Sequence, residues 1–178
     1  MKNLLVFLIS ILFLLLQKLT FCSIRCSKCH KEISHINSVF NIKSPIAINF
    51  RRKKLFNKPL VLAQVFSTPM SIQRIVSVSD QNYIPYYEII TAHKTSLFCS
   101  SEVNQTDSFF IGYGWSICNC LYCAQHQGFK FTPIESHCEK IGIVSEEERY
   151  ACERRTPFYG MILTHLESGE KVEEKVDF

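Results

Sequence analysis

Two Cys-x-x-Cys pairs lie far apart in this chain of 178 residues, and they restrict its fold more than any other feature. The first pair is Cys26 and Cys29, and the second is Cys120 and Cys123. Two intervening residues let both sulfurs of a pair reach one ion from a tight turn. Two such turns complete a tetrahedral four-cysteine site with bonds of about 2.3 Å. The interval between the pairs far exceeds the roughly 15–20 residues of a compact zinc ribbon. A metal at these cysteines would therefore tie distant parts of one domain together.

The N-terminus has the pattern of a secretory signal peptide. Lys2 precedes an uncharged apolar run at residues 4–16, and Gln17 and Lys18 close it. The run is shorter than the about 20 apolar residues that span a membrane. We expect cleavage near Cys22, a secreted protein and no stable membrane insertion after cleavage. An uncleaved signal anchor in the secretory pathway is the alternative.

Five more cysteines bring the total to nine. If Cys22 leaves with the signal, an even set remains: Cys99, Cys118, Cys138 and Cys152. We expect two disulfides among these four, in one of three connectivities, and Cys118 could exchange with Cys120. Secreted chains favour disulfides, so both Cys-x-x-Cys pairs could also be oxidised. The residues alone leave metal and disulfides open for those two pairs.

After the signal, short runs rich in β-branched and aromatic residues predict a mainly β domain. The runs are PLVLAQVF (59–66), SIQRIVSV (71–78), YYEIITAH (86–93), FKFTP (129–133) and FYGMILTH (158–165). EEERYACERR (146–155) indicates at least a helical turn. We assign residues 1–22 to the signal, 23–165 to one domain and 166–178 to a flexible charged tail.

The charge pattern argues against a nucleic-acid partner. The formal net charge is only +4, and two of the lysines belong to the signal. RRKK at residues 51–54 is the one basic cluster, and we interpret it as a solvated loop. Asn104-Gln105-Thr106 is an N-glycosylation sequon in a polar stretch, so we expect a glycosylated surface loop there.

Aromatic residues stand on both sides of the second cysteine pair. FFIGYGW (109–115) precedes it and HQGFKF (126–131) follows it. These motifs, in this spacing, resemble the CULT domain, the thalidomide-binding domain of cereblon and of small secreted proteins. The family pattern there is approximately WFPGYAW, then CxxC, then HLGWxF. YEIITA (87–92) also resembles the family's preceding strand, whereas residues 29–85 match weakly.

The resemblance implies a particular fold and metal. The family folds as a β-tent, in which two antiparallel sheets pack at a steep angle and a four-cysteine zinc site pins them. The resemblance therefore favours structural Zn²⁺ at Cys26, Cys29, Cys120 and Cys123 over disulfides.

The resemblance also implies a ligand site. In the family, three tryptophans form an open cage around a flat cyclic imide or uracil-like ring. Phe109, Trp115 and Phe129 occupy these positions here, with Phe131 at the base. Asp107 stands where the family commonly has histidine, in the neighbourhood whose backbone contacts the ring. Only one tryptophan is retained, which makes the cage wider and removes two indole N–H donors.

We therefore expect a secreted zinc-containing module that binds a cyclic imide or uracil-like ring, on a small molecule or a modified peptide end, without catalysis. One alternative is an enzyme like the methionine sulfoxide reductases of the B type, which share the two-CxxC zinc site. Such an enzyme needs a further catalytic cysteine, for which Cys138 beside His137 is the candidate. The arginine-rich motif of that family is absent around Cys138. The other alternative is a structural interaction protein whose cage has degenerated.

Overall fold

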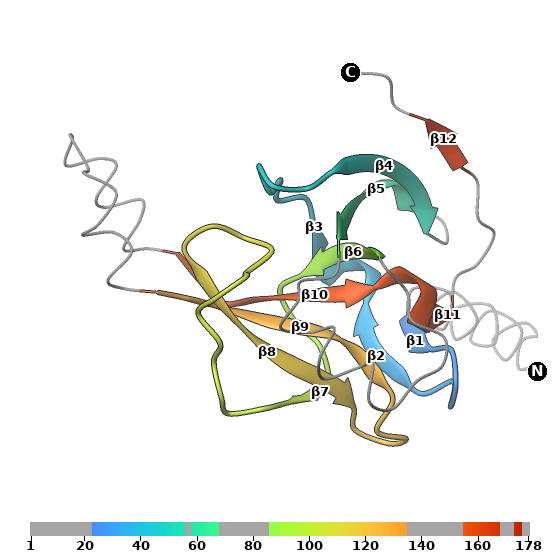
Figure 1. Cartoon of the computed structure of the whole chain (residues 1–178). Coiled ribbons are helices and arrows are strands. Elements are labelled where there is room, and N and C mark those ends of the chain that lie inside the picture. The colour runs from blue at the N-terminus through green and yellow to red at the C-terminus, as the bar shows by residue number, and fades with distance from the viewer. Residues whose placement is uncertain (1–22, 56–57, 68–85, 135–154, 168–172, 176–178) are drawn as a thin grey trace, which may run out of the picture.

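The computed structural model describes residues 23–55, 58–67, 86–134, 155–167 and 173–175. In these ranges the protein is mainly β, with two antiparallel sheets (Figure 1). Four cysteines from the two sheets and their turns cluster together. The predicted fold class is thereby confirmed. The described ranges contain no helix that is long and apolar enough to cross a membrane. The predicted signal peptide lies outside them.

The larger sheet has nine strands and carries the second cysteine pair and the aromatic motifs. Its main path runs β12 (Glu173–Lys175), β4 (Asn49–Leu55), β5 (Lys58–Ser67), β6 (Tyr86–Ala92), β10 (Phe158–Ile162), β9 (His126–Pro133), β8 (Tyr113–Cys120) and β7 (Leu97–Cys99). β3 (Val39–Phe40) pairs with β6 off this path. Hairpin β8–β9 therefore lies near one edge of the sheet, with only the short β7 outside it.

The smaller sheet carries the first cysteine pair. Its strands, in order, are β11 (Leu166–Glu167), β1 (Ser23–Cys26) and β2 (Glu32–His35). Two single-turn 3₁₀ helices carry the chain from one sheet to the other. They are η1 (Ile36–Ser38), between β2 and β3, and η2 (Leu163–His165), between β10 and β11. The two sheets are thus joined by short, tight connections.

Two hydrophobic clusters lie on opposite faces of the larger sheet. On β6, Tyr87 and Ile89 belong to an aromatic cluster, whereas Ile90 and Ala92 belong to an aliphatic one. Successive side chains of a strand point to opposite faces, so this alternation separates the clusters. The aliphatic cluster also contains residues of β1 and β2 and the two buried cysteines of the four-cysteine cluster, Cys26 and Cys120. It therefore fills the space between the two sheets.

Most of the predicted strands that can be compared are present. The runs at 59–66, 86–93 and 129–133 form β5, β6 and β9 almost in full. The run at 158–165 is a strand only to Ile162 and then turns into η2. The predicted strand at 71–78 lies outside the described residues, as does the predicted helical turn at 146–155 except for Arg155.

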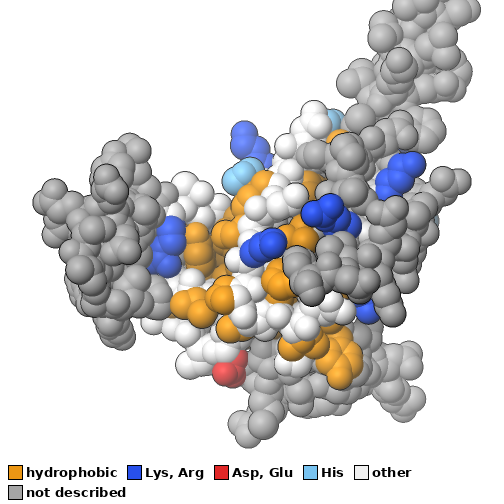
Figure 2. Space-filling model, turned by 90° about the horizontal axis from the view of Figure 1, so that it is seen from above, with side chains coloured by type: hydrophobic (Ala, Val, Ile, Leu, Met, Phe, Trp, Pro, Cys, Tyr) orange, Lys and Arg blue, Asp and Glu red, His pale blue; other side chains and the backbone are white. Residues whose placement is uncertain are grey.

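The basic cluster RRKK is part of strand β4, so the predicted loop is wrong. β4 pairs with β5, and Arg52 lies opposite Leu62. Lys53 is buried, with its Nζ 3.5 Å from Oε1 of Glu88 on β6, while Arg51 and Lys54 are exposed. Pairing with a long neighbour has overridden a sequence of low strand propensity. Figure 2 shows basic side chains at several separate places on one face of the molecule.

Two segments of the predicted tail take part in the sheets. Leu166, the first residue of that tail, is buried in the aliphatic cluster and lies opposite Cys26 in β11. Farther along, β12 pairs antiparallel with β4, with Glu174 opposite Arg52. These pairings join residues 166–167 to the smaller sheet and residues 173–175 to the larger one.

Candidate functional site

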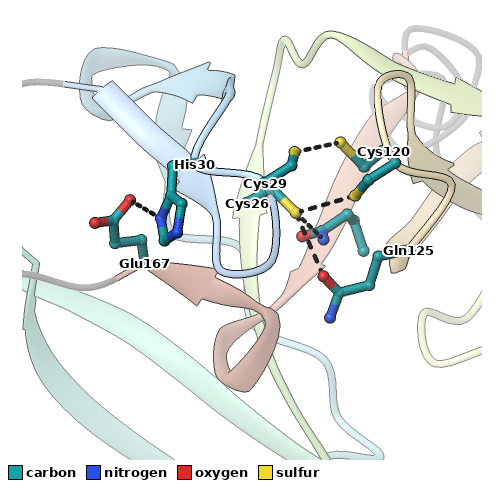
Figure 3. A network of polar contacts seen from close by, with 8 residues as sticks. Cys26, Cys29, His30, Cys120, Gln125 and Glu167 are labelled. Atoms are coloured by element: carbon teal, nitrogen blue, oxygen red, sulfur yellow. Dashed lines mark hydrogen bonds and ion pairs between the residues drawn. The ribbon is translucent and has the colours of Figure 1, made fainter.

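The four cysteines of the two Cys-x-x-Cys pairs meet between the sheets. Cys26 ends β1 and Cys120 ends β8, while Cys29 and Cys123 lie in the turns that follow (Figure 3). All four sulfurs lie within 4.8 Å of one another. The Cys26–Cys123 and Cys29–Cys120 sulfur distances are both 3.6 Å. A tetrahedron with bonds of about 2.3 Å has edges of about 3.8 Å. The cluster is therefore close enough to hold a metal ion.

The two turns have the same backbone conformation. The residue after the second cysteine of each turn is left-handed, with φ 59° at His30 and φ 58° at Ala124. Its N–H donates to the carbonyl of the turn's first cysteine, at 2.9 Å in both turns. The N–H of that first cysteine donates to the carbonyl five residues later, at 3.0 Å and 2.8 Å. Left-handed backbone costs a residue other than glycine about 1–2 kcal/mol, so these hydrogen bonds offset a real strain.

The electrostatics of the cluster favour a bound cation. Burial raises the pKa of the Cys120 thiol, but the backbone N–H groups of Tyr122 and Cys123 outweigh it and lower this pKa to about 7. At Cys29 the Lys31 N–H lowers the pKa, but burial and the neighbouring sulfurs raise it to about 12. One thiolate therefore forms easily and the next is opposed. A cation removes this repulsion, because thiolates are the form of cysteine that binds metals.

Two glutamine side chains approach the Cys26 sulfur, and the sequence analysis singled out neither of them. Gln127 is fully buried, and its Nε2 donates to the sulfur at 3.0 Å. The Gln125 side-chain carbonyl lies 3.4 Å from the same sulfur (Figure 3). The Gln127 N–H suits a thiolate and therefore a metal-bound cysteine, whereas the Gln125 carbonyl can accept only from a protonated thiol. No local pattern singles out Gln127, which lies between His126 and Gly128 with a second amide at Gln125.

A disulfide joins Cys99 of β7 to Cys118 of β8, two of the four cysteines for which we expected pairing. The two residues lie directly opposite each other, with Cα atoms 4.0 Å apart. The disulfide therefore fastens the edge strand to β8 two residues before Cys120. Cys118 is thus paired with Cys99 and has not exchanged with Cys120. Cys138 and Cys152 lie outside the described residues, so the second expected pairing stays a prediction.

The four predicted cage aromatics lie together in the aromatic cluster. Phe109, Trp115, Phe129 and Phe131 are all at most 3% exposed. The Phe129 ring stands nearly perpendicular to Trp115, at 5.8 Å and 90°, and steeply to Phe109, at 5.2 Å and 69°. Phe131 lies 6.3 Å from Phe109 and 6.4 Å from Phe129. Three of these pairs are edge to face, which is a favourable arrangement for aromatic rings, and the pair of Phe129 and Phe131 is tilted at 46°.

Polar groups beside these rings are bound within the protein. The Trp115 indole N–H donates to the Thr106 carbonyl at 2.8 Å. The buried Ser44 hydroxyl donates to the Phe109 carbonyl at 2.6 Å, and Gln64 accepts from the Ser44 N–H at 2.7 Å. The sequence did not single out Ser44, Gln64 or Thr106. The two contacts of Ser44 span 20 and 65 positions, which no local pattern reveals, whereas the contact of Thr106 with Trp115 spans nine.

Asp107 and Asn104 lie on the segment that leads into the aromatic motif. Asp107 is exposed, with a left-handed backbone at φ 54°. Asn104 exchanges two backbone hydrogen bonds of 2.8 Å with Trp115, and its side chain accepts from both the N–H and the hydroxyl of Thr106. A cavity of about 320 Å³ lies between residues 100–104 and β8, with Trp115 in its wall. Of the four predicted cage aromatics, Trp115 is the one in the wall of this cavity, and it is itself 3% exposed.

His126 lies between the aromatic and the metal clusters. Its ring packs 5.1 Å from Phe129, and its carbonyl accepts from Nδ1 of His165 at 2.7 Å. The carbonyl of His165 in turn accepts from the N–H of Ser27, inside the first cysteine turn, at 3.0 Å. Burial and, second, the neighbouring His165 lower the pKa of His126 to about 4. The imidazole is therefore neutral at physiological pH.

Comparison with known proteins finds a partial likeness. The chain is 33% identical over 70 residues to cereblon of Gallus gallus. The matched residues make up 39% of this chain and 15% of cereblon, so the chain spans only a small part of that protein's length. The scan against protein-family models found no match. The likeness and the four-cysteine cluster together agree with the resemblance to cereblon that the motifs indicate.

Proposed function

We propose that this protein is a zinc-containing binding module of the CULT type, which takes a flat cyclic imide or uracil-like ring at its aromatic cluster. The observation that carries the proposal is the content of hairpin β8–β9. In it Trp115 lies opposite Phe131 and diagonal to Phe129, on one face of the sheet. Both Cys120 and Cys123 lie at the turn of the same hairpin. A metal would thus hold the hairpin that presents the aromatic rings.

The metal in this proposal is a structural Zn²⁺. Four cysteine sulfurs at tetrahedral spacing are the ligand set of structural zinc sites. The likeness to cereblon supports the same choice. With four protein ligands no position remains for water, so the ion would fix the sheets and carry out no chemistry. The module would accordingly bind its ligand without transforming it.

The aromatic cluster must open to admit a ring. Phe109 and Trp115 both contact Phe129, so a ligand between them needs one ring to move outward. Phe109 is the ring that can move, because it follows the loop that carries Asp107, whereas Trp115 and Phe129 lie on paired strands. Once inside, a flat ring would have its faces covered by aromatic rings. Exclusion of water would then strengthen polar contacts to the loop backbone.

The proposal also places the protein in the secretory pathway, secreted after cleavage of residues 1–22. The Cys99–Cys118 disulfide supports this, because disulfides persist in oxidising compartments. Expression of the full chain in animal cells tests it. We expect the protein in the medium with an N-terminus near Ser23 and a glycan at Asn104. Retention in the cytosol with an intact N-terminus would overturn this part of the proposal.

Titration of the metal-loaded protein with thalidomide and with uridine tests ring binding. Trp115 is the chain's single tryptophan, so its fluorescence reports on the cluster directly. We expect saturable quenching, because a ring stacked beside the indole changes its surroundings. Folded, metal-loaded protein that gives no response to either compound would overturn the proposed ligand class.

A matched pair of variants locates the response. Phe109→Leu removes an aromatic wall that is 2% exposed, and Phe98→Leu makes the same change at a ring that is 65% exposed on β7. We expect Phe109→Leu to abolish the quenching and Phe98→Leu to keep it. Circular dichroism of both variants verifies that the fold is intact. Equal quenching in the two variants would move the ligand away from this cluster.

A further inference from the structure

The buried amide of Gln127 has an unusual position in the sheet. Along hairpin β8–β9 the register passes from Cys118 opposite Gly128 to Asn119 opposite His126. Gln127 is therefore an extra residue, a β-bulge in β9. Bulges change the direction of a side chain, and they recur next to functional sites. Here the bulge accompanies a side chain that is 0% exposed and reaches across to the other sheet.

The glycine after the bulge makes this arrangement possible. Gly128 has φ 152°, a backbone conformation that other residues rarely adopt. A Cβ at this position would collide with the carbonyl of Gly160 on the neighbouring strand β10. The backbone at position 128, directly after Gln127, therefore admits only glycine.

The polar contacts of Gln127 point to one partner, the Cys26 sulfur. Nε2 lies 3.0 Å from this sulfur, which is itself 0% exposed. Among the described residues the other amide atom, Oε1, has no hydrogen-bond partner. A buried polar atom without a partner destabilises a fold, so a leucine at this position would be the less costly residue. The N–H···S contact has to compensate, and a hydrogen bond to a charged sulfur is stronger than one to a neutral thiol.

We propose that Gln127 is a positioning residue of the metal centre, whose amide holds the Cys26 thiolate in place and stabilises its negative charge. The inference rests on the proposed metal site and is independent of ring binding. A partner of this kind orients a ligating atom and slows its exchange, and its loss typically lowers metal affinity about 10–100-fold. Gln127 would thereby support the site from β9 through its contact with the Cys26 sulfur, in addition to the four sulfur ligands themselves.

Cobalt substitution tests the assignment, because Co²⁺ reports on its sulfur ligands by absorption. We compare the full chain with Gln127→Leu and Gln127→Met, the second of which keeps the side-chain length without the N–H. A thiolate that loses its hydrogen bond gives up electron density more readily. We therefore expect the sulfur-to-cobalt charge-transfer bands to move to longer wavelength, with the tetrahedral d–d bands retained. Transfer of Zn²⁺ to a chelator should become about 10-fold faster.

Gln64→Leu is the matched control. Gln64 is also 0% exposed and uses its amide in two hydrogen bonds, to the N–H of Ser44 and the carbonyl of Ile42. None of these groups belongs to the metal centre, so the cobalt bands and the chelator rate should stay at the wild-type values.

The outcomes separate this inference from the proposed metal site. Unchanged bands and rates in both folded Gln127 variants would overturn the role of Gln127, as would equal changes in Gln64→Leu. Wild-type protein that takes up no Co²⁺ or Zn²⁺ would overturn the metal site itself, and the role of Gln127 with it.

Discussion

The metal end and the aromatic end of hairpin β8–β9 are built on opposite principles. At the aromatic end the rings pack against one another, and the indole of Trp115 and the carbonyl of Phe109 are hydrogen-bonded within the protein. At the metal end four thiols crowd together, and the pKa of Cys29 is raised to about 12 while that of Cys120 is lowered to about 7. The aromatic end thus needs no bound ligand to satisfy these polar groups. The metal end is stable as four thiolates only around a cation.

This difference indicates that the metal end has a structural role and that the aromatic end can rearrange to admit a ligand. An ion bound by all four sulfurs would hold the two sheets in one arrangement. The aromatic end is held by many weak ring contacts, each worth about 0.5–1.5 kcal/mol beyond burial. A ligand ring can replace contacts of the same kind. We therefore expect a ligand to bind at the aromatic end, where it can replace ring contacts, while the metal end stays fixed.

Removal of the metal should have the largest effect on stability. We expect chelation, or Cys120→Ser, to cost on the order of 10 kcal/mol, comparable with the whole net stability of a domain. Because β8 also carries Trp115, the aromatic cluster should unfold with the metal end. The tryptophan emission, followed during chelation, should shift to the red together with the loss of sheet signal in circular dichroism.

Cys99→Ser is the control for that experiment. It removes the disulfide beside Cys120, whose cysteines are 19 positions apart, and should cost about 3 kcal/mol with the metal retained. If chelation left the Trp115 emission unchanged, the two ends would be independent, and the comparison drawn above would fail.

Truncation at the aromatic end should cost less and leave the metal alone. Phe131 is fully buried, with rings of Phe110 and Phe158 at 4.8 Å and 5.1 Å. We expect Phe131→Ala to lower the free energy of unfolding by about 3–5 kcal/mol, from lost burial and the cavity it leaves. Urea denaturation measures this loss. Zinc affinity, from competition with a chelator, should remain within about 2-fold of wild type, and a larger loss would mean that the ends are coupled through the sheet.

His126, between the two ends, should give the smallest effect and only in acid. Its folded pKa of about 4 lies below the unfolded value of about 6.5, so folding favours the neutral ring. Its contribution is fully present above pH 6.5 and is lost as the pH falls towards 4. Between pH 6 and pH 4.5 this amounts to about 2 kcal/mol. Denaturation of the wild type and of His126→Gln at both pH values measures it.

The comparison between the two proteins removes the part of the acid effect that comes from the cysteines. We expect the wild type to lose about 2 kcal/mol more than His126→Gln over this range. Equal losses in the two proteins would mean that His126 is protonated in the folded state at its ordinary pKa.

The chain's own residues were enough to predict much of the larger sheet. PLVLAQVF and YYEIITAH became β5 and β6 because β-branched and aromatic residues fit a pleated, half-buried surface. The four clustered cysteines could be recognised as two pairs because Cys-x-x-Cys spacing is a local property of a turn. The residues alone, however, left open whether those pairs hold a metal, and only the tertiary structure brings their sulfurs to within 4.8 Å of one another, close enough to hold an ion.

Features that depend on distant segments could not be predicted from the sequence. RRKK forms a strand because its backbone pairs with β5. Lys53 is buried next to Glu88 of β6, whose carboxylate lies 3.5 Å from the Lys53 ammonium. Gln127 could not be assigned, since its role follows from a bulge that turns it towards a cysteine 101 positions away. Local propensity and turn geometry thus determined which segments are strands and which cysteines form pairs. Only the tertiary structure decided which polar groups meet, because those contacts depend on how the two sheets come together.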